Sequence, residues 1–246
     1  MQVDRRHTQL GDSFVAEDIR QMRLATRYTD WLHALVRPHM GRRILEVGCG
    51  IGTMTTRLLE RADAVFGIEP NADCAVELDA LLERYARERF DYRVWRIEES
   101  DMQLMHAKAF DTILCMNVLE HIEHDVEAVR TFAEILRPTR GRMVLLVPAV
   151  PQAYGNIDSA LGHFRRYSRR GLTDVLRKAG VDVELVRYSN SVGLLGWLYN
   201  AKLGARVKQS DAQIKLFDRG IVPWLSRLEA LIAPPVGLSL LAVGRA

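Results

Sequence analysis

Cysteine is scarce in this sequence, which holds three among 246 residues. Cys49, Cys74 and Cys115 are odd in number and lack the paired spacing of metal-binding cysteines, so we predict neither a disulfide framework nor a zinc site. Thiols without partners suit a reducing compartment, and we therefore expect a cytoplasmic protein.

Long apolar runs are missing as well. Residues 1–14 contain no apolar segment of signal-peptide length, and no later stretch reaches the roughly 20 apolar residues that span a bilayer. We expect no transmembrane segment. The apolar stretches "VGLLGWLY" and "WLSRLEALI", at residues 192–199 and 224–232, would still permit shallow contact with a membrane surface.

Charge of one sign is not in large excess. The formal net charge of +3 and the pI near 8.8 fall short of the concentrated positive charge of nucleic-acid-binding domains, so no nucleic-acid partner is expected. The stretch "RRYSRR" at residues 165–170 is locally basic. It forms either a solvated loop and helix start or a contact for an anion.

Apolar residues, by contrast, make up 48% of the sequence and follow an alternating pattern. Short apolar runs of strand length alternate with segments whose apolar residues recur every three or four positions, which is typical of helices. This pattern predicts one α/β domain with a doubly wound, mostly parallel sheet of seven strands, helices on both faces and an antiparallel last strand. The predicted strands are residues 43–47, 64–68, 92–97, 110–116, 142–148, 181–188 and 238–246.

Three parts of this single domain, residues 1–246, differ in their patterns. Residues 1–40 carry apolar side chains at helical spacing and are predicted to form an N-terminal helical cap. Residues 41–150 contain the strands that alternate regularly with helices. Residues 151–246 begin with a polar loop and end with the late strands, which a helical insertion at residues 190–232 separates.

The sequence "ILEVGCGIGTMT" at residues 44–55 follows the first predicted strand. Its glycines, Gly48, Gly50 and Gly52, let the backbone approach a ligand closely, and ligands of doubly wound sheets bind beyond the carboxyl ends of the strands. A dinucleotide-binding fingerprint needs another glycine at position 53 or 55, where the chain has Thr53 and Thr55. The loop therefore disfavours a nicotinamide cofactor, although an oxidoreductase stays an alternative.

Two acidic residues narrow the choice of ligand. Glu46 places a carboxylate beside the glycine loop, where it would repel a pyrophosphate and attract a cationic group. Glu69 ends the next predicted strand in "GIEP", where its two oxygens can accept both hydroxyls of a ribose. A nucleoside that carries a cationic group matches S-adenosylmethionine.

At these residues the chain resembles the class I S-adenosylmethionine-dependent methyltransferases. The resemblance rests on "EVGCGIGT", "GIEP", "FDTILCMNVLEHIEHD" and "ILRPTRGRMVLLVPA", in that order, and covers residues 41–150. One departure is "RPTRG", where related sequences usually have "KPGG". The resemblance implies a Rossmann-like fold, S-adenosyl-L-methionine as the cofactor and an enzyme that transfers a methyl group.

The resemblance also implies a set of cofactor residues. Glu46 and the glycines would lie at the methionine end, with Asn117 facing the methionine or the methyl group. Glu69 would hold the ribose, and Glu99, with Ser100 beside it, would lie at the adenine. The expected cofactor-binding residues are Glu46, Gly48, Cys49, Gly50, Gly52, Glu69, Pro70, Glu99, Ser100 and Asn117.

The polar segment "AYGNIDSALGHFRRYS", residues 153–168, is the expected acceptor site. Hydrogen-bonding side chains are dense in it, and loops of this length in compact domains are commonly functional. We predict His163 as the general base that takes a proton from the acceptor, because imidazole titrates near neutral pH, and Tyr154 as the second candidate. Arg166 and Tyr167 would contact the acceptor, unless the arginines pair with carboxylates to hold the loop.

Tryptophans suggest the shape of the acceptor. Trp31 and Trp197 would stack on a flat molecule, since aromatic faces bind heterocycles at a modest loss of entropy, or else they belong to the core or to a dimer contact. Stacking favours a planar nitrogen heterocycle of secondary metabolism, such as a toxoflavin-like azapteridine.

The stretch "LEHIEHD" at residues 119–125 has histidines and acids at helical spacing, which puts His121 near Asp125. A metal site is one interpretation. Acids near the positively polarised start of a helix are the simpler one, so no metal is expected, and His121 is predicted to border the pocket.

We therefore predict an enzyme that moves a methyl group from S-adenosylmethionine to nitrogen or oxygen of a small molecule. The tail is similar to a bacterial subset of these enzymes with mostly unassigned substrates, through "YGNIDSALGHFRRYS" and "RYSNSVGLLGWLYN". A lipid-linked or glycan acceptor is an alternative, and a regulator or scaffold that binds the cofactor without chemistry is another. The sequence is compatible with a monomer and with a homodimer.

Overall fold

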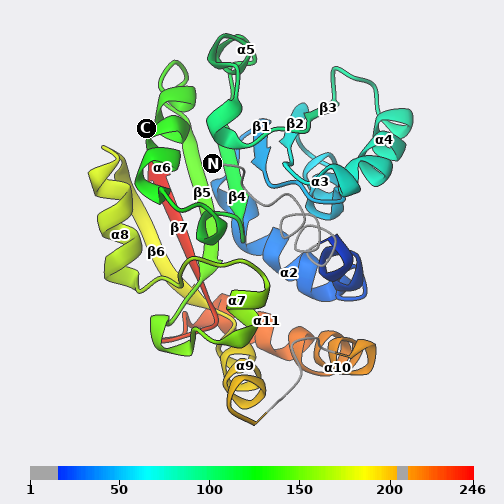
Figure 1. The fold of residues 1–246 in the computed structure, drawn as a ribbon, viewed down its shortest axis with the longest axis vertical. Coiled ribbons are helices and arrows are strands. Elements are labelled where there is room, and N and C mark those ends of the chain that lie inside the picture. The colour runs from blue at the N-terminus through cyan, green and yellow to red at the C-terminus, as the bar shows by residue number, and fades with distance from the viewer. Residues whose placement is uncertain (1–15, 204–209) are drawn as a thin grey trace, which may run out of the picture.

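A seven-stranded mixed sheet forms the centre of the protein (Figure 1). The computed structural model describes residues 16–203 and 210–246. The strand order is β3-β2-β1-β4-β5-β7-β6, and β7 runs antiparallel to β5 and β6 while the other neighbours are parallel. This is the doubly wound, Rossmann-like architecture that the sequence predicts. The strands are β1 (Arg43–Val47), β2 (Ala64–Ile68), β3 (Phe90–Arg93), β4 (Thr112–Met116), β5 (Arg142–Pro148), β6 (Asp182–Ser189) and β7 (Ser239–Arg245).

Strand positions follow the apolar runs, because a parallel sheet that is covered on both faces needs apolar side chains on both sides of each strand. In β1 and β2 the last four residues of each strand are buried in succession. β3 differs from its prediction at residues 92–97, since it lies at Phe90–Arg93. Its neighbour β2 ends at Ile68, opposite Arg93, and the chain leaves the sheet at that point.

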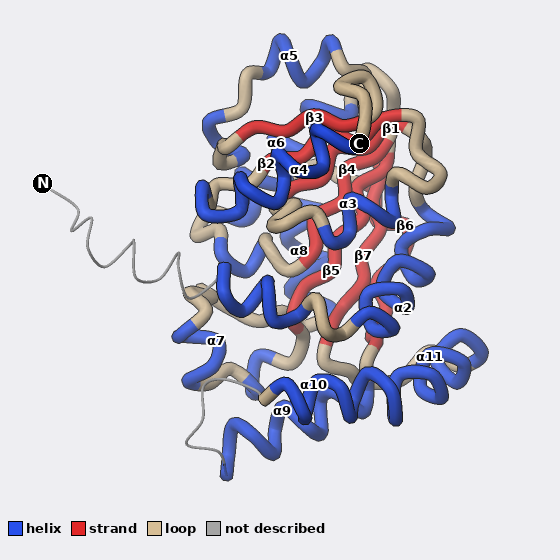
Figure 2. Tube along the Cα trace, turned by 90° about the vertical axis from the view of Figure 1, so that its right-hand side faces the viewer, coloured by secondary structure: helices blue, strands red, loops and turns tan. Residues whose placement is uncertain are grey.

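Helices cover both faces of the sheet (Figures 1 and 2). α5, α6 and α8 pack on one face, where Met105, Phe132 and Leu176 belong to one buried apolar cluster. α2, α3 and α4 pack on the other, where Val36 and Leu78 belong to a second cluster. From residue 26 on, the α-helices are α2 (Thr26–Val36), α3 (Thr53–Leu58), α4 (Ala75–Arg84), α5 (Met102–Ala107), α6 (Asp125–Leu136), α7 (Asn156–Ala160), α8 (Arg169–Lys178), α9 (Ser191–Leu203), α10 (Asp211–Leu216) and α11 (Val222–Leu231).

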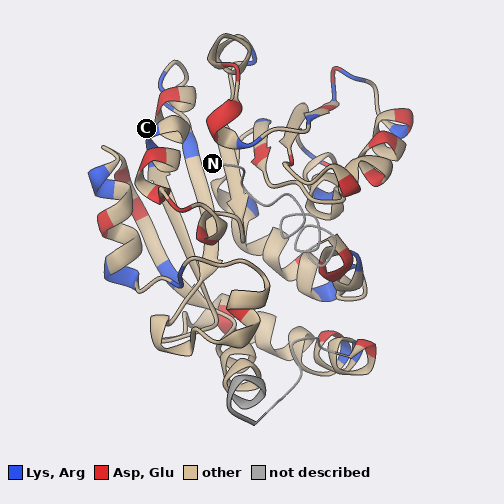
Figure 3. Ribbon diagram, in the orientation of Figure 1, with Lys and Arg blue, Asp and Glu red and all other residues tan. Residues whose placement is uncertain are grey.

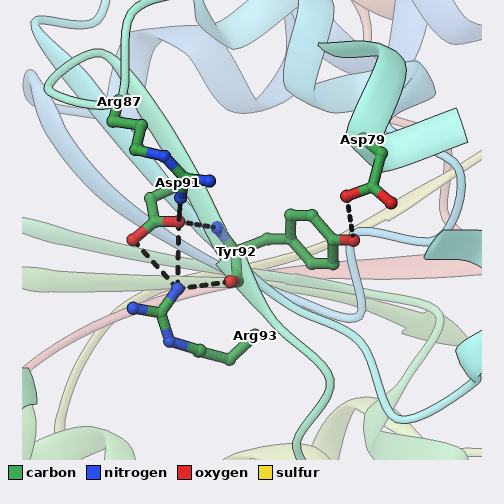
Figure 4. Close-up of polar contacts among 5 residues, drawn as sticks. All are labelled: Asp79, Arg87, Asp91, Tyr92 and Arg93. Atoms are coloured by element: carbon green, nitrogen blue, oxygen red, sulfur yellow. Dashed lines mark hydrogen bonds and ion pairs between the residues drawn. The ribbon is translucent and has the colours of Figure 1, made fainter. Parts of the chain in front are cut away.

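Polar side chains line the sheet edge at β3 (Figure 4). The Asp91 carboxylate lies 3.2 Å from the Arg87 guanidinium and 2.9 Å from that of Arg93. The Tyr92 hydroxyl donates to Asp79 of α4 at 2.7 Å, and burial, with Asp79 adding to it, raises the pKa of Tyr92 to about 12. Charged groups on an edge strand hinder its pairing with another sheet, so this network protects the edge.

The late helices gather where the parallel strands end. Pro148 at the end of β5 pairs with Ser239 at the start of β7, and Ser239 pairs with Ser189 at the end of β6. α7, α9, α10 and α11 lie together at that end of the sheet (Figure 1). The described parts of the predicted insertion, residues 190–203 and 210–232, form separate helices, with Pro223 in the first turn of α11, where proline is favoured.

The described part of the N-terminal cap lies beside the glycine loop. Residues 16–22 of this part are helical, and the Ile19 side chain lies 3.4 Å from the position that a Cβ on Gly50 would take. Arg20 forms an ion pair with Glu77 of α4 at 2.7 Å, which joins the cap to the second layer of helices. Residues 1–15 of the predicted cap lie outside the described residues.

Charges of both signs are mixed on the outer surfaces of α4, α8 and α10 (Figure 3). In the basic stretch at residues 165–170, Arg165 pairs with Asp125 at 2.9 Å and Arg166 pairs with Asp158 at 2.7 Å. These arginines hold the loop through carboxylates, which is one of the two roles that the sequence left open.

Candidate active site

Left-handed backbone shapes the glycine loop after β1. Gly48 has a φ of +74° and Gly52 one of +77°, which residues with side chains rarely adopt. A Cβ on Gly48 would also collide with Val118, which follows β4. The amides of Gly48 and Cys49 donate to the Ile68 carbonyl at 2.8 and 3.2 Å, so the loop is tied to the end of β2. The loops after β1, β2 and β4 therefore meet at one edge of the sheet.

Glu69 follows β2, where the sequence predicts the ribose site. Its two carboxylate oxygens accept the amides of Gly50 at 2.9 Å and of Asn71 at 3.0 Å. These bonds fix the buried carboxylate next to the glycine loop, and Glu69 stays the residue proposed to hold the ribose. Pro70, which comes next, is exposed.

Glu46 is buried near the end of β1. Its carboxyl group accepts a hydrogen bond from the Thr55 hydroxyl at 2.6 Å. Burial raises the pKa of Glu46 to about 8, and the charge of Glu69 adds to the rise. A positively charged group beside Glu46 would favour its ionised form, so this carboxyl group suits the role proposed for it at the methionine end of a cofactor.

The predicted adenine residues differ in their surroundings. Glu99 is exposed, and its carboxylate accepts the Arg96 amide at 3.0 Å within a short 3-10 helix, Ile97–Glu99. The Ser100 hydroxyl is buried and has no hydrogen-bond partner among the described residues. Ser100 is therefore the better candidate for a polar contact with the adenine. Asn117, with a φ of +53° directly after β4, is exposed at the edge where the glycine loop lies.

Asp158 organises the loop after β5. It is fully buried, accepts the Arg166 Nε at 2.7 Å and the Gly155 amide at 3.0 Å, and lies 2.9 Å from His163 Nδ1. Burial opposes its ionisation, but the His163 hydrogen bond and the Arg166 charge outweigh burial and lower the pKa of Asp158. An ionised Asp158 favours the His163 tautomer with hydrogen on Nδ1 and leaves Nε2 as an acceptor.

Both predicted tyrosines brace this loop. The Tyr154 hydroxyl donates to the His163 carbonyl at 2.7 Å. Tyr167 is buried, and its hydroxyl donates to Asp125 at 2.9 Å. Because this hydrogen bond engages the hydroxyl within the loop, Tyr154 is a weaker candidate for a base than His163. Tyr167 serves to position the loop.

The two tryptophans have different neighbours. The Trp197 indole N–H donates to the Ala153 carbonyl at 3.1 Å, and the Arg166 guanidinium lies 4.2 Å from the centroid of its ring. Trp197 is thus joined to the loop that carries His163. Trp31 is 5% exposed and packs against α11 in a small apolar cluster, which matches the core role that was its alternative.

Glu120 and His121 follow β4 and lie beside this loop. Both belong to the short 3-10 helix Leu119–His121, whereas α6 begins later, at Asp125, so the predicted helical spacing between His121 and Asp125 is wrong. Burial raises the pKa of Glu120 to about 8 and lowers that of His121 to about 4, and the charge of His163 adds to the second shift. Our sequence reasoning missed Glu120. Its signal is "NVLEHI", an acid among apolar residues just after a buried strand.

Topology and strand-end residues together define a class I S-adenosylmethionine-dependent methyltransferase. Residues 19–186, more than half of the chain, match the family model of the methyltransferase domain, and the chain belongs to that family, whose cofactor is S-adenosylmethionine.

Curated relatives of this chain include O-methyltransferases. The ubiquinone biosynthesis O-methyltransferase of Xanthomonas axonopodis pv. citri (strain 306) is 28% identical over 197 residues, which cover 73% of this chain and 77% of that enzyme. The like-named enzyme of Marinobacter nauticus (strain ATCC 700491 / DSM 11845 / VT8) is 26% identical over 155 residues, which cover 58% of this chain and 65% of that enzyme. The matched segment thus spans 77% of the first relative and 65% of the second.

Solved structures share the fold. The 1,6-didemethyltoxoflavin-N1-methyltransferase of Burkholderia thailandensis, with 1,6-didemethyltoxoflavin and S-adenosylhomocysteine bound, has a TM-score of 0.61 and 20% identity and covers 100% of this chain and 91% of its own. An S-adenosylmethionine-dependent methyltransferase from Mesorhizobium loti has a TM-score of 0.59 and 17% identity. The match covers 87% of this chain and 95% of that chain. At these identities the likeness shows the fold alone.

The strand ends fit this cofactor on their own chemistry. The buried Glu46 carboxyl lies where a cationic methionine end would favour its ionisation. Glu69, fixed by two amides, offers a charged acceptor to hydroxyl groups. Because residue 48 is glycine, no side chain occupies the turn of the loop, and a ligand can approach the backbone there. These residues would hold the cofactor.

Proposed function

We propose that this protein transfers a methyl group from S-adenosylmethionine to an oxygen of a small-molecule acceptor. The observation that carries the proposal is the position of His163, which Asp158 orients in the loop after β5. β5 is the parallel neighbour of β4, and Val118 after β4 packs on Gly48 of the glycine loop. Donor and acceptor would therefore bind at one edge of the sheet. Similarity to O-methyltransferases favours oxygen over nitrogen.

The proposed reaction is an in-line displacement. When bound, S-adenosylmethionine supplies an electrophilic methyl group, whose bond to sulfur breaks as its bond to the acceptor oxygen forms. His163 Nε2 takes the proton of the acceptor hydroxyl, a step that typically contributes about 10²–10⁴-fold. Glu46 and Glu69 orient the donor, which reduces the entropy lost on reaching the transition state.

A methyl-transfer assay tests this proposal. The protein is incubated with S-adenosylmethionine that carries a labelled methyl group and with a panel of phenols and planar nitrogen heterocycles. We expect the label in an O-methylated product. Label on nitrogen would favour the toxoflavin-like heterocycle instead, and no turnover despite cofactor binding would favour the non-catalytic regulator.

A second candidate acceptor is a lipid-linked molecule. None of the described helices is long and apolar enough to span a membrane. On α11, however, Trp224, Leu228 and Leu231 are 74%, 58% and 84% exposed, and their spacing places them on one face of the helix. Such a stripe can lie on a bilayer surface.

Sedimentation with phosphatidylcholine vesicles tests this second candidate. The parent protein should sediment with the vesicles, and Trp224→Glu should reduce the bound fraction. Val76→Glu, at a residue of α4 that is 76% exposed, is the matched control and should bind as the parent does. A parent protein that stays in the supernatant argues for a water-soluble acceptor.

A further inference from the structure

Glu120 is a buried acid whose carboxylate oxygens lack a hydrogen-bond partner among the described residues. It is 0% exposed, and neither carboxylate oxygen takes part in a hydrogen bond within that part of the chain. Nearby Arg166 directs its guanidinium to Asp158 and to the Ala149 carbonyl. A buried carboxylate is strongly unfavourable unless it is paired or binds a metal ion. The position of Glu120 therefore points to a cationic ligand.

Two histidines lie beside this carboxylate. Ligand atoms of Glu120, His121 and His163 all lie within 4.8 Å of one another. The imidazole rings of the two histidines meet edge to face, with centroids 4.6 Å apart. His163 Nδ1 is engaged by Asp158, so Nε2 is the nitrogen left for a ligand. A carboxylate behind a histidine orients the imidazole on a metal ion and strengthens it as a ligand.

We propose that Glu120, His121 and His163 bind a divalent transition-metal cation. Bonds of about 2.0–2.2 Å to a shared ion separate ligand atoms by at most about 4.4 Å, so a small inward rotation of the side chains closes the site. Two imidazoles with one carboxylate favour Zn²⁺, Co²⁺, Fe²⁺ or Mn²⁺ over Ca²⁺ and Mg²⁺, which take oxygen ligands. Three protein ligands leave coordination positions open, as in catalytic metal sites.

The open positions have a use in methyl transfer, and this part of the inference rests on the function proposed above. An acceptor hydroxyl at such a position loses its proton to solvent more readily, because the cation favours the ionised oxygen. The methyl carbon then forms its bond to that oxygen as its bond to sulfur breaks. His163 is a ligand in this arrangement, and the cation replaces it as the group that promotes proton loss.

Titration of the metal-free full chain with Co²⁺ tests the site. The protein is stripped with a chelator, and the visible absorption of Co²⁺ is followed as the ion is added. We expect one equivalent to bind. Glu120→Gln and His121→Ala should each weaken binding by at least about 100-fold, because loss of an outer contact alone costs about 10–100-fold. His124→Ala, at an exposed histidine of the same segment, is the matched control and should bind Co²⁺ normally.

Thermal unfolding distinguishes a variant that has lost the metal site from one that folds poorly. Co²⁺ should raise the unfolding midpoint of the parent and of His124→Ala and leave that of Glu120→Gln unchanged. Without metal and below the Glu120 pKa of about 8, Glu120→Gln should be about as stable as the parent, because both side chains are then uncharged. A parent that does not bind Co²⁺, or binding that survives both Glu120→Gln and His121→Ala, overturns the proposal.

Calorimetry with S-adenosylhomocysteine on the same metal-free protein separates the two proposals. Cofactor binding without Co²⁺ binding removes the metal site and leaves the methyltransferase function standing. Co²⁺ binding without cofactor binding does the reverse.

Discussion

The imidazole rings of His121 and His163 stand at 89° to one another with their centroids 4.6 Å apart. His121 follows β4, His163 lies in the loop after β5, and these two strands are parallel neighbours. Parallel strands bring the loops after them to one edge of the sheet, where residues distant in sequence meet. The proposed acceptor side of the site results from this strand pairing.

Gly48→Ala should destabilise the fold. The φ of +74° is unfavourable for alanine, and the added Cβ would collide with Val118. We expect a loss of about 1–3 kcal/mol in the free energy of unfolding, measured by urea denaturation. Gly196→Ala in α9 is the control, because its Cβ would meet nothing within 4 Å. It should be neutral or stabilise by up to about 1 kcal/mol, and equal effects of the two variants would contradict the steric role of Gly48.

Glu46 should make the cofactor-free protein less stable as the pH rises. Its pKa of about 8 in the folded state lies above the usual 4.5, so between these values the folded state keeps a proton that the unfolded state has lost. The stabilisation is therefore complete below the unfolded pKa and is lost as the pH rises through the folded pKa, with a slope of at most about 1.4 kcal/mol per pH unit. Urea denaturation at several pH values between about pH 5 and pH 8 measures this slope. Glu46→Gln should lack this part of the slope, and identical pH dependence in both proteins would refute the shift.

His163→Ala should lower turnover by about 10²–10⁴-fold and leave cofactor affinity nearly unchanged. If His163 is the base, the pH profile of turnover also loses the rising limb that a general base produces. If His163 binds a cation, excess cation should restore part of the turnover. Tyr154→Phe is the matched control, because it removes the hydrogen bond to the His163 carbonyl, and its effect should be far smaller. Parent-like turnover in His163→Ala would make His163 a structural residue and Tyr154 the next candidate.

The sheet and the glycine loop are predictable because their signals are local. The strands at residues 43–47, 64–68 and 142–148 match their apolar runs, since buried parallel strands require such runs. The edge strand β3 is less predictable, because its end depends on where β2 stops pairing with it. The glycines at positions 48 and 52 are predictable because the backbone turns sharply after β1 and takes positive φ angles there, which glycine adopts readily.

The acceptor side depends on contacts between separate loops, which spacing along the chain does not encode. Helical spacing related His121 to Asp125, but the 3-10 helix before α6 turns His121 toward His163 instead. The commitment of Arg166 to Asp158 and the burial of Glu120 likewise arise from the packing of loops after β4 and β5. The sequence therefore indicates His163 as a candidate, whereas the burial of Glu120 beside it becomes visible only in the fold.

Calorimetric titration with S-adenosylhomocysteine tests the central claim most directly, that the ends of β1 and β2 form the cofactor site. The parent protein should bind S-adenosylhomocysteine and not NAD, and Glu69→Ala should weaken binding by about 1–3 kcal/mol, because charge-assisted hydrogen bonds to the ribose are lost. Glu83→Ala, at an exposed acid of α4, should bind as the parent does. Binding of NAD in preference, no binding of S-adenosylhomocysteine, or parent-like affinity in Glu69→Ala would contradict the account.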